Sequence, residues 1–149
     1  MIKTISTPNK IEIIFPLIKK FCKAAKAPYR AGEMAHWLRQ SVGSPLMRVV
    51  VSDTDGLHGF AVMYLMQDIM TPKLFVSQFY AEGDDEKKAA AKKELSEYIV
   101  KTAMDNGIGI ITYHTYHDPD WMIERFGEIG YKFEKRGSVL EMALSVEEA

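Results

Sequence analysis

Residues 78–95 read QFYAEGDDEKKAAAKKEL. The stretch starts as the end of a β-strand, passes through an acidic turn and continues as an alanine- and lysine-rich helix. Asp84 or Asp85 can cap that helix, and Glu86 suits the positive end of its dipole. A turn of this kind is also where many α/β proteins bind a phosphate, because the first amides of a helix lack partners within it. The stretch predicts a strand–helix junction and leaves two interpretations of the turn open, a helix cap or an anion site.

Hydrophobic periodicity extends this assignment to both sides of the junction. The sequence predicts a strand at 1–6, helices at about 11–25 and 31–41, two strands within 46–68 that join at the turn 53–56, and a strand at 73–81. Pro16 is expected to kink or split the first helix. The long helix at about 84–105 is followed by a strand at 108–117, a helix at 119–129 and a final strand or hairpin at 131–144. This order predicts an α/β (α+β) fold with a mixed, mostly antiparallel sheet and helices on both faces.

Length and composition limit what the chain can do. Its 149 residues predict a single domain, 1–149, that folds alone. Lys and Arg number 19 against 20 Asp and Glu, so the net charge of −1 disfavours nucleic acid as a partner. No apolar run is long enough to span a membrane, and the first ten residues lack the apolar region of a signal peptide. The single cysteine, Cys22, cannot form an internal disulfide, which predicts a reducing, cytoplasmic location.

Two longer stretches carry a resemblance to a known family. Residues 49–65, VVVSDTDGLHGFAVMYL, form a hairpin whose acidic-glycine turn leads into a Gly-Phe-Ala strand. Residues 121–142, WMIERFGEIGYKFEKRGSVLEM, form a helix, a Gly-aromatic turn and a strand. Together with the order of elements, they resemble the GCN5-related N-acetyltransferase family, which transfers an acyl group from acyl-CoA to an amine. The resemblance covers nearly the whole chain.

The sequence departs from the family's pattern at two functional places. The family's pyrophosphate loop carries a basic residue and two glycines before the long helix, whereas this chain has EGDDEKKAA with one glycine and several carboxylates. The family's closing helix often carries a tyrosine that protonates the departing thiolate, and the matching residue here is Phe126. The resemblance therefore implies a divergent member. Tyr80, Tyr113 or Tyr116 could supply the missing hydroxyl, although aromatic residues in strands are more often part of the core.

The resemblance also implies roles for particular residues. Acetyl-CoA or another acyl-CoA would lie across the strands that end at Ala81 and His117, with its pantetheine arm held by the backbone of Phe79, Tyr80 and Ala81. The pyrophosphate would meet the start of the long helix, at Asp85, Glu86, Lys87, Lys88 and Ala89. Catalysis would fall to His117 as the base that takes the amine's proton and to Tyr80 as an acid. Direct attack by the amine agrees with the lack of a Ser/His/Asp arrangement in the sequence.

Histidines and acids close together in TYHTYHDPD, residues 112–120, raise the alternative of a metal site. On a strand, however, His114 and His117 are three positions apart and point to opposite faces, so we expect no metal. For His117, the ordinary imidazole pKa near ~6.5 suits a general base. A surface or capping role for the same histidine stays open.

Three functions from different classes fit the sequence. The first is an acyl-CoA-dependent N-acyltransferase whose acceptor is a small-molecule or peptide amine. The second is a catalytically inactive module of the same fold that binds or supports a partner, which the acidic turn and Phe126 favour. The third is a small-molecule binding protein that uses the same cleft without chemistry. The final strand could also pair with a second copy to form a homodimer.

Overall fold

The structure is a computed structural model that describes residues 1–67, 71–114, 119–128, 130 and 132. Contacts within the chain divide it into two compact units, residues 1–116 and 117–149. The first unit holds all the strands among the described residues, and the second holds helix α4 (Pro119–Glu128). The expected single domain, 1–149, stays a prediction.

The elements of the first unit follow the predicted order. They are β1 (Ile2–Ile5), the short 3₁₀ helix η1 (Pro8–Lys10), α1 (Ile11–Ala24), α2 (Ala31–Ser41), β2 (Met47–Asp53), β3 (Leu57–Gln67), β4 (Pro72–Ala81), α3 (Asp85–Asp105) and β5 (Ile111–Tyr113). Helix α1 runs through Pro16 as one element, so the expected split is wrong. The turn between β2 and β3 contains Asp55 and Gly56, both with positive φ, as a tight hairpin requires. The predicted strand or hairpin at 131–144 lies outside the described residues.

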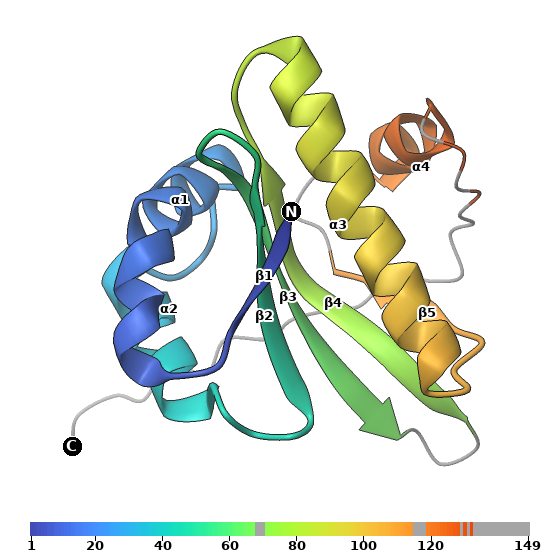
Figure 1. Ribbon diagram of the computed structural model, residues 1–149, viewed down its shortest axis with the longest axis horizontal. Coiled ribbons are helices and arrows are strands. Elements are labelled where there is room, and N and C mark those ends of the chain that lie inside the picture. The colour runs from blue at the N-terminus through green and yellow to red at the C-terminus, as the bar shows by residue number, and fades with distance from the viewer. Residues whose placement is uncertain (68–70, 115–118, 129, 131, 133–149) are drawn as a thin grey trace, which may run out of the picture. The chain divides into compact units, whose positions relative to one another are not determined.

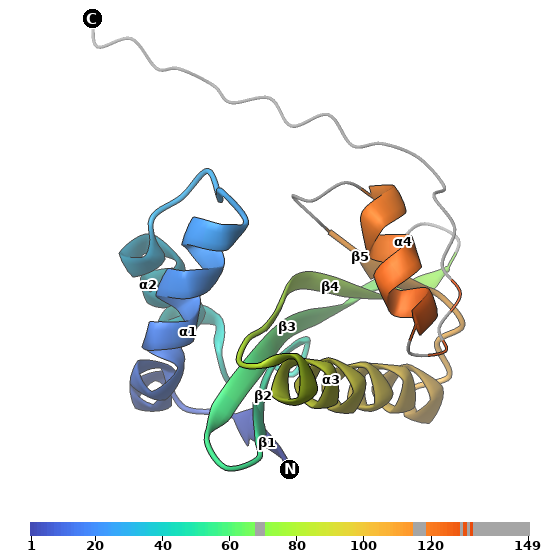
Figure 2. The same ribbon diagram turned by 90° about the horizontal axis from the view of Figure 1, so that it is seen from above.

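The sheet is mixed and mostly antiparallel, as predicted. Its strand order is β1-β2-β3-β4-β5, in which the first four strands pair antiparallel and β4 pairs parallel with β5. Helices α1 and α2 lie on one face of this sheet and α3 lies on the other (Figures 1 and 2). The long helix connects two adjacent parallel strands, which places its N-terminus directly after the end of β4.

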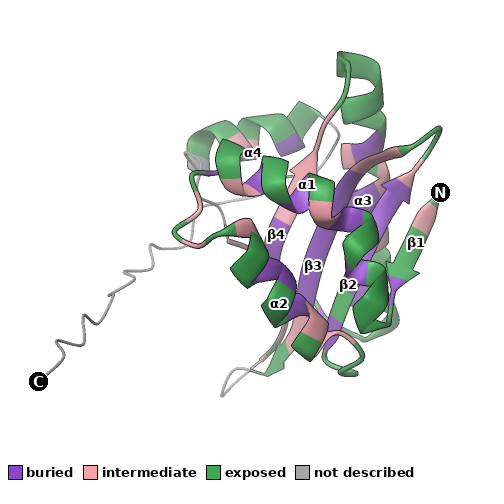
Figure 3. Cartoon of the chain, turned by 90° about the vertical axis from the view of Figure 1, so that its left-hand side faces the viewer, coloured by how far each residue is buried: buried purple, intermediate pink, exposed green. Residues whose placement is uncertain are grey.

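Each face of the sheet carries its own hydrophobic core. One core joins α1 and α2 to the sheet through Val49, Val51, Phe60 and Val62, and the other joins α3 through Val50, Ala61, Met63, Leu95 and Ile99. Alternating residues of β2 and β3 thus enter opposite cores, as the two-residue period of a strand requires. Buried residues accordingly line the central strands and the inner sides of the helices that cover them (Figure 3).

A β-bulge interrupts the pairing of β3 with β4. Val62 pairs with Gln78 and Met63 pairs with Val76, so Ser77 is an extra residue in β4. Before the bulge, Leu74 and Val76 face the α3 core. After it, Phe79 joins that core, while Tyr80 packs into the core under α1 and α2. The bulge therefore decides which side chains at the end of β4 face α1 and α2.

Candidate functional site

The bulge builds a short chain of hydrogen bonds on the face of the sheet that α1 and α2 cover. The Ser77 hydroxyl donates to Gln78 Oε1 and lies 3.4 Å from the Val62 carbonyl oxygen. Gln78 Nε2 in turn donates to the hydroxyl of Tyr29, in the loop between α1 and α2, at 3.2 Å. Ser77 and Gln78 are both buried. The side-chain amide of Gln78 is therefore held in one orientation, with its two ends bonded to different elements.

Tyr64 lies on the same face, on β3. Its hydroxyl oxygen is buried and has no hydrogen-bond partner among the described residues. Its ring contacts that of Trp37, at a centroid distance of 5.9 Å, and that of Phe75, at 6.4 Å. Burial raises the pKa of Tyr64 to about 12, against a smaller lowering by the neighbouring Ser77 hydroxyl, which does not meet the geometry of a full hydrogen bond. Tyr64, Ser77 and Gln78 thus place three buried polar groups on this face of the sheet.

At the end of β4, three residues form a second polar cluster: one from β4, one from the turn that follows it and one from α1. The Tyr80 hydroxyl donates to Glu82 Oε2 at 3.3 Å, and the Lys20 ammonium of α1 lies 3.0 Å from Glu82 Oε1. The Tyr80 ring packs against Phe21 and Phe60, each at a centroid distance of 6.3 Å. Burial raises the pKa of the Tyr80 phenol, and the charge and hydrogen bond of Glu82 raise it further. Tyr80 therefore keeps its proton at neutral pH.

The acidic turn ends in a helix cap. Asp84 is the N-cap residue of α3, and its carboxylate accepts a hydrogen bond of 2.8 Å from the Lys87 amide. This confirms the cap interpretation for Asp84 and occupies one of the amides that an anion would use. The predicted cofactor-binding residues Asp85, Glu86, Lys87, Lys88 and Ala89 follow it in the first turns of α3, and all are exposed. Gly83 has a φ of +109°, which only glycine adopts easily.

The other predicted residues lie along the edge of β4. Phe79 faces the α3 core, with its ring edge-on to Tyr113 of β5 at 5.9 Å. Ala81 is the last residue of β4 and pairs with Gly59 of β3. The described pairing of β4 with β5 covers Leu74–Val76 and Ile111–Tyr113, and the amide of His114 donates to the Val76 carbonyl at 2.9 Å. The predicted base His117, like Tyr116, lies outside the described residues.

The structure brings Tyr80 together with residues that the sequence did not single out as functional. Lys20, Tyr29 and Gln78 come from the first helix, the following loop and the bulge, so their spacing gave no motif. From the sequence, Glu82 is only one of the carboxylates of the acidic turn, whose charge opposes a phosphate. Within the described part of the chain, no group of three or more His, Cys, Asp or Glu side chains could hold a metal ion.

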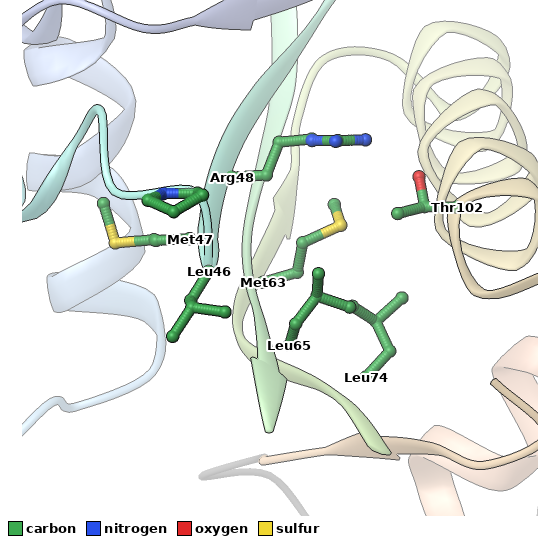
Figure 4. A pocket seen from close by; sticks show the side chains of 8 residues that line it. Leu46, Met47, Arg48, Met63, Leu65, Leu74 and Thr102 are labelled. Carbon is green, nitrogen blue, oxygen red and sulfur yellow. The ribbon is translucent and has the colours of Figure 1, made fainter. Parts of the chain in front are cut away.

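A hollow at the other end of the sheet contains none of these residues. It has a volume of about 210 Å³, open solvent included, and Leu46, Met47, Met63, Leu65 and Leu74 are among its lining residues. Arg48 reaches across it toward α3, where Thr102 lies (Figure 4), and its guanidinium donates to Tyr98 at 3.2 Å. This hollow is distinct from the candidate site, because its lining is mainly aliphatic and because it lies near Leu74, away from Tyr80 along β4.

Comparison with solved structures gives close matches in fold over almost the whole chain. One is a probable acetyltransferase with a TM-score of 0.75 and 13% identity, covering 99% of each chain. A second is the ribosomal-protein-alanine N-acetyltransferase from Brucella melitensis biovar Abortus 2308, with a TM-score of 0.71 and 15% identity over 95% of this chain and 99% of that one. A third is an aminoglycoside acetyltransferase from an uncultured soil metagenomic sample, in complex with sisomicin, with a TM-score of 0.75 and 12% identity over 97% and 96% of the two chains.

No family model matches the sequence, and no curated protein sequence matches it either. At these levels of identity the structural likeness establishes the fold. It confirms the resemblance and the fold class that the sequence predicted. None of the described helices is long and apolar enough to cross a membrane.

Proposed function

We propose that this chain, which has the fold of the GCN5-related N-acetyltransferases, is an acyl-CoA-dependent N-acyltransferase. Acetyl-CoA or a related acyl-CoA is the donor, and an amine of a small molecule or peptide is the acceptor. The structural neighbours include an aminoglycoside acetyltransferase in complex with sisomicin, which supports an acceptor of this class. The cytoplasmic location expected from the single Cys22, and a homodimer, belong to the same proposal.

The observation that carries the proposal is the bulge at Ser77. It lies directly after Val76, the last residue of β4 in the described pairing with β5. A bulge bends and twists its strand, and bulges often occur next to functional sites, where they change the direction of a side chain. The four residues that follow, Gln78–Ala81, lead into the start of α3. In the proposal, the backbone of Phe79, Tyr80 and Ala81 holds the pantetheine arm of the donor.

The pyrophosphate would meet the first turn of α3 through backbone amides. Asp85, Glu86, Lys87, Lys88 and Ala89 surround this point, and their exposed position suits contact with a ligand. Helix N-terminal amides bind anions through their dipoles without needing a cationic side chain. The Asp84 carboxylate competes for one of them, the Lys87 amide. We therefore expect weaker binding of CoA than a glycine-rich loop would give.

The amine would attack the thioester directly, with His117 as the base and Tyr80 as the acid. The Tyr80 phenol is protonated at neutral pH and so has a proton to give to the departing thiolate, although burial and Glu82 raise its pKa and make it a weaker acid. The Glu82 carboxylate holds this hydroxyl before the ligand arrives. A His117→Ala or Tyr80→Phe variant should then lose most turnover while it keeps its affinity for acetyl-CoA, as single-turnover kinetics and binding titrations would show.

The second candidate is a catalytically inactive module of the same fold, or a protein that binds a ligand at the same site without chemistry. The specific observation in its favour is the Asp84 cap, which fills part of the anion site within the protein itself. The two candidates differ in one measurable property, since only a working transferase consumes acetyl-CoA in the presence of an amine.

Thermal unfolding with and without acetyl-CoA tests the proposal. A ligand at 100 times its dissociation constant stabilises the native state by about 2.7 kcal/mol. Acetyl-CoA should raise the melting temperature, while acetate and free pantetheine should raise it less because they lack one half of the contacts. No shift at millimolar acetyl-CoA or CoA would rule the proposal out. A shift without release of free thiol in the presence of amines would favour the binding module.

A further inference from the structure

Helix α1 brings one lysine to the end of β4. Lys20 directly precedes Phe21, whose ring packs edge-on against Tyr80 at a centroid distance of 6.3 Å. The Lys20 ammonium lies 3.0 Å from Glu82 Oε1, and the other oxygen of Glu82 accepts the Tyr80 hydroxyl at 3.3 Å. A primary amine, a carboxylate and a phenol thus meet in one cluster beside the strand that holds the proposed acyl donor.

The three groups differ in their access to solvent. The Lys20 side chain is 58% exposed, whereas the Glu82 side chain is only 20% exposed. The amine is therefore open to solvent and to a ligand that binds there, while the carboxylate is mostly covered and held by its two partners. The neighbouring Lys19 on the same helix is also exposed, but its ammonium lies over the Phe15 ring, 5.0 Å from its centroid. Only Lys20 of the two has a carboxylate partner in the described structure.

From this cluster we propose that the chain acylates its own Lys20, using acyl-CoA as the donor. The inference rests on the proposed function, because it needs an acyl-CoA bound along Phe79–Ala81. A primary amine is the group that the proposed reaction acylates, and Lys20 is one that the fold itself supplies at the site. Glu82 is the group that takes its proton.

The reaction balances without any further reagent. The Lys20 ammonium gives one proton to Glu82 Oε1, and the nitrogen lone pair attacks the thioester carbonyl carbon. The carbon–sulfur bond then breaks, and sulfur leaves with the bonding electron pair. The thiolate takes up the second proton lost from nitrogen. The products are Nε-acyl-lysine at position 20, CoA thiol and one proton, which Glu82 releases to solvent.

Acylation would remove the charge of Lys20 and with it the ion pair to Glu82. Glu82 would then carry an unpaired negative charge three residues before the first residue of α3. Like charges repel, so the modified protein should bind the phosphates of a second acyl-CoA less tightly. Self-acylation would thus lower the affinity of the protein for its own donor.

Site-resolved mass spectrometry tests this inference. The purified full chain is incubated with acetyl-CoA, and acetylation is followed over time at Lys20, with Lys19 and Lys23 of the same helix as matched controls. Since a positioned base accelerates a reaction about 10²–10⁴-fold, Lys20 should react at least about tenfold faster than Lys19. Its rate should not depend on protein concentration, because the amine and the donor site belong to one molecule.

The Glu82→Gln variant separates assisted acylation from simple chemical labelling. If Glu82 takes the proton, the variant should acetylate Lys20 at the slow rate of Lys19. Chemical labelling predicts the opposite sign, because loss of the ion pair frees the amine. Equal rates at Lys20 and Lys19, or a faster reaction of Lys20 in Glu82→Gln, would overturn the inference. Stabilisation of the protein by acetyl-CoA, measured on the same samples, separates failure of this inference from failure of the proposed function. If acetyl-CoA binds but Lys20 reacts no faster than Lys19, self-acylation alone is overturned. If acetyl-CoA does not bind, the proposed function is overturned as well.

Discussion

Gly59 shows how one missing side chain brings the candidate site together. A Cβ at this position of β3 would lie 2.7 Å from the Tyr80 carbonyl oxygen and 3.0 Å from Leu95 Cδ1. The first atom belongs to the backbone of β4 and the second to a fully buried side chain of α3. Glycine therefore allows β3, β4 and α3 to approach each other directly beside Tyr80.

Gly59→Ala should destabilise the protein by about 1–3 kcal/mol, because the added methyl group overpacks a backbone contact. Gly32→Ala is the matched control, since Gly32 lies in α2 with nothing within 4 Å of its added Cβ. That variant should be unchanged or up to about 1 kcal/mol more stable, because alanine favours the helix. Urea unfolding of the two variants measures both effects, and equal stability would contradict this account of Gly59.

Tyr64 makes stability depend on pH at the alkaline end. Its folded pKa of about 12 lies above the ordinary value of 10.0, so the native state favours the neutral phenol. This contribution is fully present below pH 10 and is lost as the pH rises from about 10 to about 12, because the unfolded chain ionises first. The free energy of unfolding of the wild type should therefore fall more steeply over this window than that of Tyr64→Phe.

At pH 7 the same Tyr64→Phe change should alter the stability by less than about 1 kcal/mol, because the lost hydroxyl has no partner in the described part of the chain. Chemical denaturation at several pH values gives both results. If the two proteins lost stability in parallel above pH 10, another group would be responsible for the alkaline transition.

At the scale of single elements, the start of α3 joins a structural role to a proposed functional one. Asp84 caps the helix, and the same carboxylate occupies the Lys87 amide that a phosphate could bind. The sequence was sufficient to predict this cap, because Asp is one of the residues that the N-cap position favours. The helical spacing of Ala91, Leu95 and Ile99 also predicts that they form the inner face of α3, and all three are buried.

Asp84→Ala should therefore change stability and ligand affinity in opposite directions. Loss of the cap should destabilise the protein by about 1 kcal/mol. If the proposed function is correct, acetyl-CoA should bind more tightly, because one amide becomes available and one negative charge is removed. Asp85→Ala, which removes the same charge without the cap bond, is the control for electrostatics. Thermal unfolding and a binding titration, carried out side by side, give both quantities, and weaker binding by Asp84→Ala would place the phosphates elsewhere.

Sequence reasoning failed where a contact joins distant segments. Periodicity placed β4 at 73–81, and the structure gives Pro72–Ala81. The same pattern could not reveal the bulge at Ser77, because a bulge is defined by the partner strand. For the same reason it could not show that Lys20 meets Glu82, or that Gln78 donates to Tyr29, since 62 and 49 positions separate these pairs. The split expected at Pro16 did not occur: α1 continues through this proline, and Ile14, Leu17 and Ile18 around it are buried.

At the scale of the first unit, the sheet couples the two cores. β2 and β3 send alternate side chains into the core under α1 and α2 and into the core under α3. A destabilising substitution in one core should therefore also destabilise the strands that form part of the other core. This arrangement predicts one cooperative transition for the two helical layers, as small domains usually show.

Leu95→Ala tests this coupling. Leu95 is fully buried in the α3 core, and its truncation should cost about 2–5 kcal/mol. In a Trp121→Phe background, Trp37 of α2 is the single tryptophan and reports on the opposite layer. Trp37 fluorescence and the circular dichroism of the helices should then shift to the same lower urea midpoint. A Trp37 midpoint that Leu95→Ala leaves unchanged would show that the layers unfold separately.

The extra residue at Ser77 also changes which of the following residues of β4 face each side of the sheet. In a regular strand, Gln78 and Tyr80 would continue the series of Leu74 and Val76 and enter the apolar space beneath α3. The insertion moves them by one position, so that the glutamine reaches Tyr29 and the tyrosine reaches Glu82. Phe79 takes the place that they leave. Deletion of this one serine would restore a regular alternation and leave Gln78, Phe79 and Tyr80 on their present faces, whereas a regular strand that kept Ser77 would turn the polar end toward α3. A backbone irregularity, and no single side chain, therefore determines what this edge presents to a ligand.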